Sequence, residues 1–517
     1  MKHQKLTTAW KQYEEGRAYK RTVGLYRRVD ENERFYRGDQ WKGVDAGGLP
    51  TPVFNLIKRI GSYLISAVLS YKLTVRYDDM GIPYADPSDA IRKREATLEA
   101  LNRVTACRWK QSGMDTVLRR ALYDAILSGD GIFYCCFDPT LPGAGDFAGD
   151  IRTTTLDSVN LFAADMNSDD IQHQEWLILS GRASVDMLRR EAAAAGLPAD
   201  QADRIRPDRD YDDGAGDFAS YETGDKATYL IRFYRDDEGF VCWEKCTRET
   251  VIRAVRTGMR RYPIAMFHWD TVKNSFHGSS PITELIQNQK YVNKAYAMVM
   301  KHMVDTAFSK VIYDKRLIPE WTNEVGEAIG VLSGGDVSNV ATTLGVGEMQ
   351  DGYRELIDSV IENTKELTGA TEIVLGEADP NNTSAIIALR EMAEVPLDQV
   401  RASIAACMEE LALIWLEMMR EYFPDIRSYA DGEGVVCLDL ACLPADSVNA
   451  YVDSGASRRF SQSMLLSTLQ SLLDAGHITF AEYLERLPEG VLTDKDKLLA
   501  RARGDLADAD VGGDANG

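Results

Sequence analysis

The stretch TVLRRALYDAILSGDGIFYCCFDP, residues 116–139, contains both kinds of regular secondary structure. Its first part, 116–131, has the apolar spacing of an amphipathic helix and ends in Gly-Asp-Gly, which predicts that the helix stops there. Its second part, 131–139, is rich in aromatic residues and ends in Asp-Pro, which predicts a strand followed by a turn. The chain therefore combines helices with strands, and the neighbouring segments show which of the two dominates.

Helical patterns are longer and more numerous than strand patterns on both sides of this stretch. Strands are predicted at 149–165 and within 227–270. Helices are predicted over the following segments: 7–29, 89–130, 184–198, 281–303, 352–368 and 384–422. We therefore expect a mixed α+β fold that is dominated by helices, not a regular alternation of parallel strands and helices.

The helix at 281–303 runs without a breaker for roughly 34 Å, at about 1.5 Å per residue. Ser279 and Ser280 are placed to cap it, and Pro281 suits its first turn. The helix at 384–422 contains Pro396, which we expect to kink it because proline cannot donate a backbone hydrogen bond.

Composition and charge limit the classes of function. The chain has 517 residues, of which 44% are hydrophobic, enough for a buried core and for more than one domain. Its net charge of −21 does not suit tight wrapping of nucleic acid unless the basic residues are gathered on one surface. The eight cysteines form no pair of CxxC motifs, so a zinc site is not expected. No run of about eighteen apolar residues occurs, so no membrane span is expected.

Motifs of common enzymes are not found. The sequence has no phosphate-binding G-x-x-x-x-G-K-[ST] loop, no G-x-G-x-x-G after a strand, no G-x-S-x-G and no H-E-x-x-H. We therefore expect no catalytic residues, no enzyme activity and no cofactor. ATP hydrolysis in particular would need a separate protein.

The segment LGEADPNNTSAIIAL, residues 375–389, is a polar loop that leads into a predicted helix. Thr383 or Ser384 can cap that helix. The nearby oxygen-bearing side chains that could bind a hard cation are those of Glu372, Glu377, Asp379, Asn381 and Asn382. Their spacing matches no defined calcium loop, and acidic residues are common before a helix because its N-terminus favours anions. We therefore expect no metal site here.

Two groups of basic residues are candidates for binding polyanions or protein partners. Lys290, Lys294 and Lys301 are separated by four and seven residues, which places them on one face of the helix at 281–303. Such a stripe is also typical of an ordinary solvated helix face. The second group lies on or beside a predicted turn between strands and could equally be simple surface: Arg253, Arg256, Arg260 and Arg261.

Four stretches stand out in order along about 360 residues: ERFYRGDQW (33–41), FNLIKRIGSYLISAVLS (54–70), FHGSSPITELIQNQKYVNKAYAMVM (276–300) and TGATEIVLGEADPNNTSAIIALREMAEVPLD (368–398). In the third stretch, Gly278, Ser280 and Pro281 precede a Gln-x-x-x-Asn core formed by Gln289 and Asn293. Together the four stretches resemble portal proteins of tailed double-stranded DNA bacteriophages. Each is weak alone, but their order and spacing make the match fairly specific. Residues before 30 and after 430 add little to it.

The resemblance implies a subunit with wing, stem, clip and crown regions that assembles into a ring. The implied boundaries are: 1–170, the N-terminal part of the wing; 171–227, a stem-proximal helix and acidic loop; 228–275, a clip-like β region; 276–310, the stem helix; 311–368, the second part of the wing; 369–383, the tunnel loop; 384–425, a long kinked helix; 426–500, the crown; and 501–517, a disordered tail.

The resemblance also implies the partners and the residues that meet them. The ring, commonly of twelve subunits, would stand at one vertex of the capsid, where double-stranded DNA passes through it. Further expected partners are the terminase large subunit, a head–tail connector or adaptor protein, and the major capsid protein or scaffold. The tunnel loop would line the channel through Glu372, Ile373, Val374, Leu375, Glu377, Asp379, Asn381 and Asn382. Lys290, Lys294 and Lys301 would line the stem, and the four arginines would belong to the clip.

Two other classes of function remain open on the sequence. One is a metal-dependent DNA-processing enzyme that uses the loop carboxylates, which would show turnover that depends on a divalent cation. The other is an oligomeric adaptor without a channel. Electron micrographs of the purified protein, with or without rings around a central hole, distinguish these alternatives from a portal.

Overall fold

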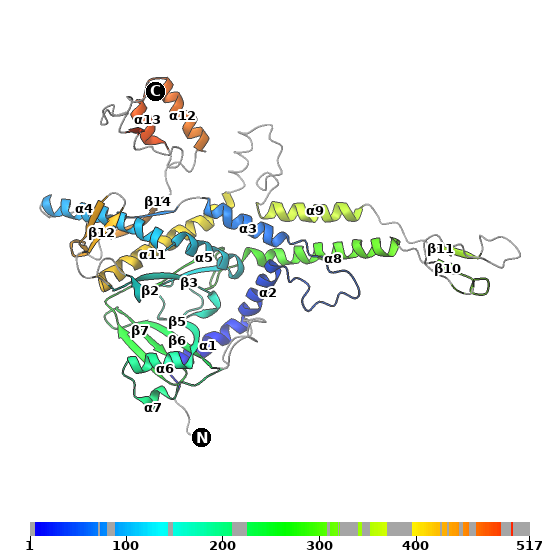
Figure 1. Ribbon diagram of the computed structural model, residues 1–517, viewed down its shortest axis with the longest axis horizontal. Coiled ribbons are helices and arrows are strands. Elements are labelled where there is room, and N and C mark those ends of the chain that lie inside the picture. Colours follow the sequence, from blue (N-terminus) through cyan, green and yellow to red (C-terminus); the bar gives the residue numbers. More distant parts are fainter. Residues whose placement is uncertain are drawn as a thin grey trace, which may run out of the picture.

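The structure is a computed structural model, and the residues it describes are 6–70, 73–79, 88–142, 148–208, 225–307, 311–318, 320, 340–343, 352–369, 395–423, 427–431, 434–443, 448–453, 462–487 and 498–499. Of the described residues, 51% are helical and 22% lie in strands. The expected mixed α+β class, with helices in the majority, is therefore confirmed. Figure 1 shows a body of helices and sheets from which a long two-helix arm projects to one side.

Five helices form the N-terminal part of the body: α1 (Thr8–Thr22), α2 (Leu25–Arg37), α3 (Leu56–Leu69), α4 (Ser88–Gln111) and α5 (Met114–Ser128). The continuous helices predicted over 7–29 and 89–130 are each divided in two. Gly24 and Gly113 lie at the breaks with φ of 70° and 63°, a left-handed conformation that glycine adopts without steric cost. Neither glycine interrupts the apolar spacing, which is why the pattern alone predicted single helices.

A three-stranded sheet with the order β3-β2-β9 follows α5. Its strands are β2 (Asp130–Pro142), β3 (Ala148–Leu156) and β9 (Ile264–His268), all antiparallel to their neighbours. The change from helix to strand that the sequence predicts at Gly129-Asp130-Gly131 is confirmed, since α5 ends at Ser128 and β2 begins at Asp130.

A five-stranded sheet with the order β4-β5-β6-β7-β8 lies beside it. Its strands are β4 (Leu161–Ala163), β5 (Trp176–Ser184), β6 (Lys226–Arg235), β7 (Val241–Cys246) and β8 (Val251–Arg256). Leu177 packs in one buried cluster with Ile132 of β2, whereas the next residue, Ile178, packs in another with Trp10 of α1. The two faces of the sheet therefore contact the three-stranded sheet and α1. Three short helices accompany it: η1 (Ser158–Asn160), α6 (Val185–Ala194) and α7 (Ala199–Ala202).

The arm consists of α8 (Pro281–Ala307) and α9 (Gly352–Leu367), which run side by side (Figure 1). Asn288, near the start of α8, donates a hydrogen bond to Thr364, near the end of α9, at 3.1 Å, so the helices are antiparallel. At the outer end of the arm lie two short paired strands, β10 (Val311–Tyr313) and β11 (Ala341–Thr343).

The described residues can be compared with the regions implied by the resemblance. The segment 228–275, expected to be clip-like, forms strands β6 to β9, which pair with other strands inside the body. Within 311–368, expected to be a second part of the wing, the described residues form β10, β11 and α9 of the arm. The assignment of these segments to the clip and the wing stays a prediction.

After the arm, the chain returns to the body. Pro396 lies in a 3-10 turn, η4 (Val395–Leu397), directly before α11 (Asp398–Tyr422). β1 (Thr74–Asp79) pairs with β14 (Val448–Asp453), which joins distant parts of the chain. The remaining elements are the hairpin β12 (Arg427–Asp431) and β13 (Gly434–Leu438), the turn η5 (Leu440–Cys442), and the mutually packed helices α12 (Gln462–Asp474) and α13 (Phe480–Arg486), which lie apart from the body in Figure 1.

The largest buried cluster joins the body to the base of the arm. It contains apolar side chains from helices α2 to α5, from β2 and β9, from α11, and from the first turns of α8. Gly131 is a tight point in this packing, because a Cβ atom there would lie 2.2 Å from the Phe267 ring and 3.0 Å from the carbonyl oxygen of Ala121. The sheet and α5 can approach this closely only because the residue between them has no side chain.

Replacing Gly131 with alanine is therefore expected to destabilise the subunit by about 1–3 kcal/mol, the usual cost of overpacking a buried site. Urea unfolding followed by tryptophan fluorescence measures the change. The matched control is Gly352→Ala at the start of α9, where the described residues outside its own turn of helix place no atom within 4 Å of the added Cβ. Equal stability of the Gly131 variant and the wild-type protein would show that this packing is not as tight as described.

Candidate functional site

Buried polar side chains connect the arm to the body at the first turns of α8. Gln289 accepts a hydrogen bond from the backbone N–H of Leu56 at 2.9 Å and donates one to Asn293 at 2.9 Å. Asn293 in turn donates to the side chain of Gln40 at 2.6 Å. Gln40 comes from one of the stretches that carry the family resemblance, Gln289 and Asn293 come from a second, and the backbone of Leu56 comes from a third, so these motifs meet in one network. Each of these three side chains is buried, so removal of one leaves a buried polar atom of its neighbour with one hydrogen bond fewer.

A second buried group lies where α5, β2 and the start of α8 meet. The carboxylate of Asp130 is fully buried and accepts three hydrogen bonds. The donors are Nδ1 of His268 at 2.8 Å, Nδ1 of His277 at 2.7 Å and the backbone N–H of Gly278 at 2.7 Å. His268 ends β9, whereas His277 and Gly278 lie just before α8. One carboxylate therefore links the sheet to the beginning of the arm.

The C-terminal end of α5 is closed off by the same region. Its carbonyl groups would otherwise lack partners, but the Ser280 hydroxyl donates to the carbonyl oxygen of Ile126. Gly129 and Gly278 lie back to back, and a Cβ atom on Gly129 would sit 2.5 Å from the carbonyl oxygen of Gly278. The position of the arm relative to the body therefore depends on close backbone contact at two glycines.

The ionisable groups at this junction have altered pKa values. Burial alone would raise the pKa of Asp130, but the hydrogen bonds from His268 and His277 hold it below its usual value. Burial lowers the pKa of His277, and its hydrogen bond to Asp130 offsets this only in part. Burial raises the pKa of Asp124 on α5 to about 7, and the nearby charge of Asp157 acts in the same direction. Asp130 is thus ionised at neutral pH, whereas Asp124 titrates near it.

Further along the arm, α8 exposes apolar side chains on two opposite flanks. Tyr291 and Met298 are each 46% exposed on one flank. Met300 and Val304, 40% and 54% exposed, lie on the other flank, where the half-buried Tyr296 ring also packs against Phe54. At about 100° per residue the two flanks are roughly 170° apart around the helix axis. Apolar surface on both sides of a projecting helix is unusual unless partners cover it.

The three lysines of α8 lie between these flanks, on the side away from α9. Lys290 forms an ion pair with Glu31 of α2 at 2.7 Å, and Lys301 forms one with Asp305 at 3.1 Å. Lys294 is exposed and forms no ion pair within the described part of the chain. The structure therefore confirms that the three lysines share a face, and shows that two of the three charges are partly compensated by carboxylates.

The four arginines beside the β8–β9 turn are largely engaged in contacts within the subunit. Arg261 pairs with Glu410 of α11 at 2.7 Å, and Arg256 pairs with Asp236 at 2.5 Å and with Glu238. Arg253 lies 5.6 Å from the centre of the Trp243 ring, and Arg260 lies 5.4 Å from that of Phe240. Much of this charge is thus used to hold the sheet to α11 and to its own hairpin.

The residues proposed for the tunnel loop lie outside the described residues. These are Glu372, Ile373, Val374, Leu375, Glu377, Asp379, Asn381 and Asn382, and only Gly369 at the start of the segment is described, with φ of 68°. Their position relative to the arm stays a prediction.

Within the described segments, no group of three or more histidine, cysteine, aspartate or glutamate side chains is arranged to hold a metal ion. The helices among these segments include none that is long and apolar enough to cross a membrane.

Sequence patterns did not reveal the importance of Asp130, His268 and His277. The Gly-Asp-Gly run by itself predicts only a helix stop, although an aspartate between two glycines at the start of an apolar strand is a conspicuous place for a charge. The histidines lie 138 and 147 residues further along the chain. Only a contact between distant segments identifies them as its partners.

The arrangement agrees with a comparison against known families. A family model described as the phage P22-like portal protein matches residues 11–429. This range includes most of the body, the arm and α11. No curated protein sequence matches the chain.

Asp124 gives a prediction for the pH dependence of stability. Its pKa in the folded protein, about 7, lies above the value of 3.8 for an exposed aspartate, so folding favours the protonated form. The stability it contributes is present at low pH and is lost as the pH rises through about 7. Asp124→Asn should therefore be more stable than the wild-type protein at pH 8, by about 1–3 kcal/mol, and should match it near pH 4.

Urea unfolding at pH 4, 6 and 8 measures this difference. The exposed Asp169 provides the matched control, and the Asp169→Asn variant should differ from the wild-type protein by the same small amount at each pH. A difference for Asp124→Asn that does not grow with pH would contradict the assignment.

Proposed function

The chain belongs to the phage P22-like portal protein family, and we propose that copies of it form a closed ring whose channel carries double-stranded DNA through one vertex of the capsid. Members of this family are structural proteins of the virion and not enzymes. The observation that carries the proposal for this chain is the pair of opposite apolar flanks on α8. In a ring, each subunit contacts one neighbour with one surface and the other neighbour with a second surface.

The geometry of the arm fits such a contact. If Tyr291 and Met298 face one neighbour, Met300 and Val304 face the other, because the flanks are roughly 170° apart. The remaining two sides of α8 then point along the radius of the ring. One of them is covered by α9 and the other carries the lysines. We propose that the lysine side faces the channel and that α9 lies outside it.

The charge on this face suits a channel through which DNA moves. Phosphates that are neutralised by many cations hold a protein in place on DNA. Here Glu31 and Asp305 compensate Lys290 and Lys301, which leaves Lys294 as the cation most available to phosphates. The net charge of −21 further weakens adhesion. A ring with this face towards the axis would guide the duplex without holding it.

We propose that the outer end of the arm, with β10 and β11, is the part that docks the terminase large subunit and the head–tail connector. The family resemblance implies the strands in 228–275 for this role. Those strands are paired within the body, and Arg256 and Arg261 are held by carboxylates of the same subunit, which supports the arm end instead. The body would then contact the major capsid protein or scaffold. A ring of twelve subunits and a tunnel loop over 369–383 are part of the same proposal.

Replacing Tyr291 and Met298 with glutamate is expected to prevent ring assembly, because charged side chains would be buried at each contact between subunits. Mass photometry of the purified protein at micromolar concentration should show rings for the wild-type protein and single subunits for the double variant. Met187→Glu is the control, since Met187 is 59% exposed on α6 of the body. Wild-type protein that remains monomeric or dimeric would refute the ring, and rings formed by the double variant would refute the role of this flank.

Replacing Lys290, Lys294 and Lys301 with glutamate should leave the rings intact but reduce DNA packaging several-fold, because the channel wall would then repel phosphates. Packaging is measured as DNA protected from nuclease in assembled particles. Lys273→Glu, an exposed lysine before the arm, is the control for the change of charge. Normal packaging by the triple variant with intact rings would place this face outside the channel.

A further inference from the structure

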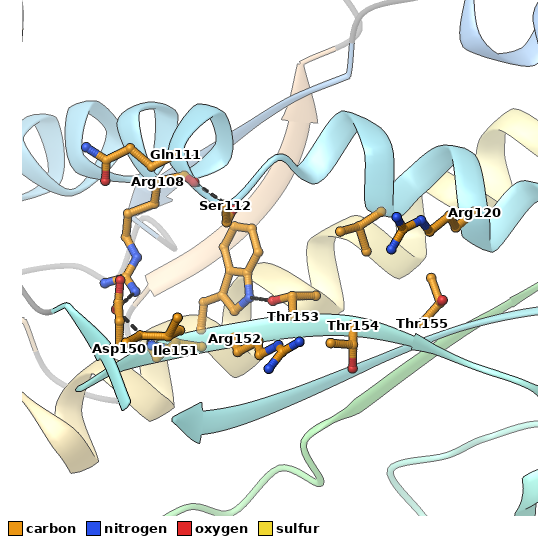
Figure 2. Close-up of a pocket in the computed structure, with 13 residues that line it drawn as sticks. Arg108, Gln111, Ser112, Arg120, Asp150, Ile151, Arg152, Thr153, Thr154 and Thr155 are labelled. Atoms are coloured by element: carbon orange, nitrogen blue, oxygen red, sulfur yellow. Dashed lines mark hydrogen bonds and ion pairs between the residues drawn. The ribbon is translucent and has the colours of Figure 1, made fainter. Parts of the chain in front are cut away.

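A groove of about 800 Å³ opens in the body between the α4–α5 connection and the strand β3 (Figure 2). One wall is the end of α4 and the start of α5, and α11 contributes the Trp415 side chain. The lining residues are Arg108, Gln111, Ser112, Val117, Arg120, Leu141, Asp150, Ile151, Arg152, Thr153, Thr154, Thr155 and Trp415. None of these residues takes part in the arm or in the junction around Asp130.

The groove runs along a strand edge that no other described strand covers. Among the strands that the structure describes, β3 is the terminal strand of the order β3-β2-β9 and pairs with β2 on one side only. Six consecutive residues of β3, 150–155, line the groove. Successive side chains of a strand point to opposite faces of the sheet, so a cavity that contacts all six lies along the edge and not over one face. This edge offers backbone N–H and C=O groups to an added strand.

The groove is predominantly basic. It is lined by three arginines and one aspartate. Arg108 pairs with Asp150, and Arg152 approaches Asp138 at 3.4 Å while its side chain stays 57% exposed. Arg120 is exposed and forms no ion pair with any residue that the structure describes. Arg120 and Arg152 are therefore available to an acidic ligand.

The floor of the groove is held in place by buried contacts. The indole N–H of Trp415 donates to the Thr153 hydroxyl at 3.0 Å. Thr153 is buried, and its hydroxyl also lies 3.5 Å from the sulfur of Cys135 on β2. Because the floor is already ordered, its side chains lose little conformational entropy when a segment binds.

We propose that this groove binds an extended acidic segment of a partner protein, which pairs with the edge of β3 as an additional strand. The peptide backbone supplies the alternating donors and acceptors that the edge requires, and acidic side chains meet Arg120 and Arg152. A nucleic acid would satisfy the arginines but not the strand edge. The site lies in the body and does not depend on ring formation.

The probe is a fluorescein-labelled octapeptide of alternating valine and aspartate, titrated with the full-length protein and followed by fluorescence anisotropy. Saturable binding is expected, and Arg120→Glu and Arg152→Glu should each weaken it at least five-fold. Arg190→Glu, the same change of charge at an exposed position on α6, should leave binding unchanged. Circular dichroism of each variant shows whether it is folded.

Three comparison probes test the mode of binding. A valine–lysine octapeptide should not bind, because its charge is opposite. An aspartate peptide with proline in place of each valine should lose binding, because proline cannot donate backbone hydrogen bonds. Equal binding of the proline peptide, or tighter binding of an eight-nucleotide oligothymidine, would overturn strand addition. No binding of the valine–aspartate peptide would overturn the proposal, and so would binding that Arg120→Glu leaves unchanged.

A second copy of this chain is the remaining possible occupant. If the arginine variants fail to assemble while the wild-type ring cannot bind the peptide, the groove is a contact between subunits, and the proposal of a separate partner is wrong. If assembly is normal and the ring binds the peptide, the groove is free for a partner. This result is independent of whether the apolar flanks of α8 form the ring contact.

Discussion

The buried carboxylate of Asp130 is the contact on which the arrangement of body and arm depends. An unpaired buried charge costs several kcal/mol, so the native state requires all of its donors to be in place. Those donors come from the end of β9, through His268, and from the residues just before α8, through His277 and Gly278. Because Asp130 itself lies between α5 and β2, one group sets the relative position of a helix, a sheet and the arm.

The base of the arm, which contains the junction around Asp130 and the network of Gln289, is packed differently from the rest of the arm. At the base, buried polar groups and the close contact of Gly129 with Gly278 allow little adjustment. Beyond the base, α8 has exposed tyrosine, methionine and valine side chains and few contacts with the body. A rigid base and an outer part with exposed apolar side chains suit a subunit that must contact its neighbours at a defined angle.

Some basic residues of both the body and the arm are paired with carboxylates of the same subunit. Several arginines of the body serve internal purposes, such as Arg261, which fastens the β8–β9 turn to α11. On α8 of the arm, two of the three lysines have carboxylate partners. Arg120 in the body groove and Lys294 on the arm are the exceptions that the proposals concern. Basic residues in a chain of net charge −21 are thus informative mainly where no carboxylate compensates them.

The sequence by itself determined the local structure: the helix that ends at Ser128, the strand that begins at Asp130, the long helix from Pro281 and the common face of its lysines. These local structures can be predicted because each helix or strand buries one face, which sets the spacing of apolar residues along the chain. The sequence also contains the motifs of the family. Only the tertiary structure decided that α9 lies along α8, that the strands in 228–275 belong to the body, and that Gln40 meets Asn293. Such pairings join residues hundreds of positions apart, and their energy depends on the packing of intervening elements, which no local pattern records.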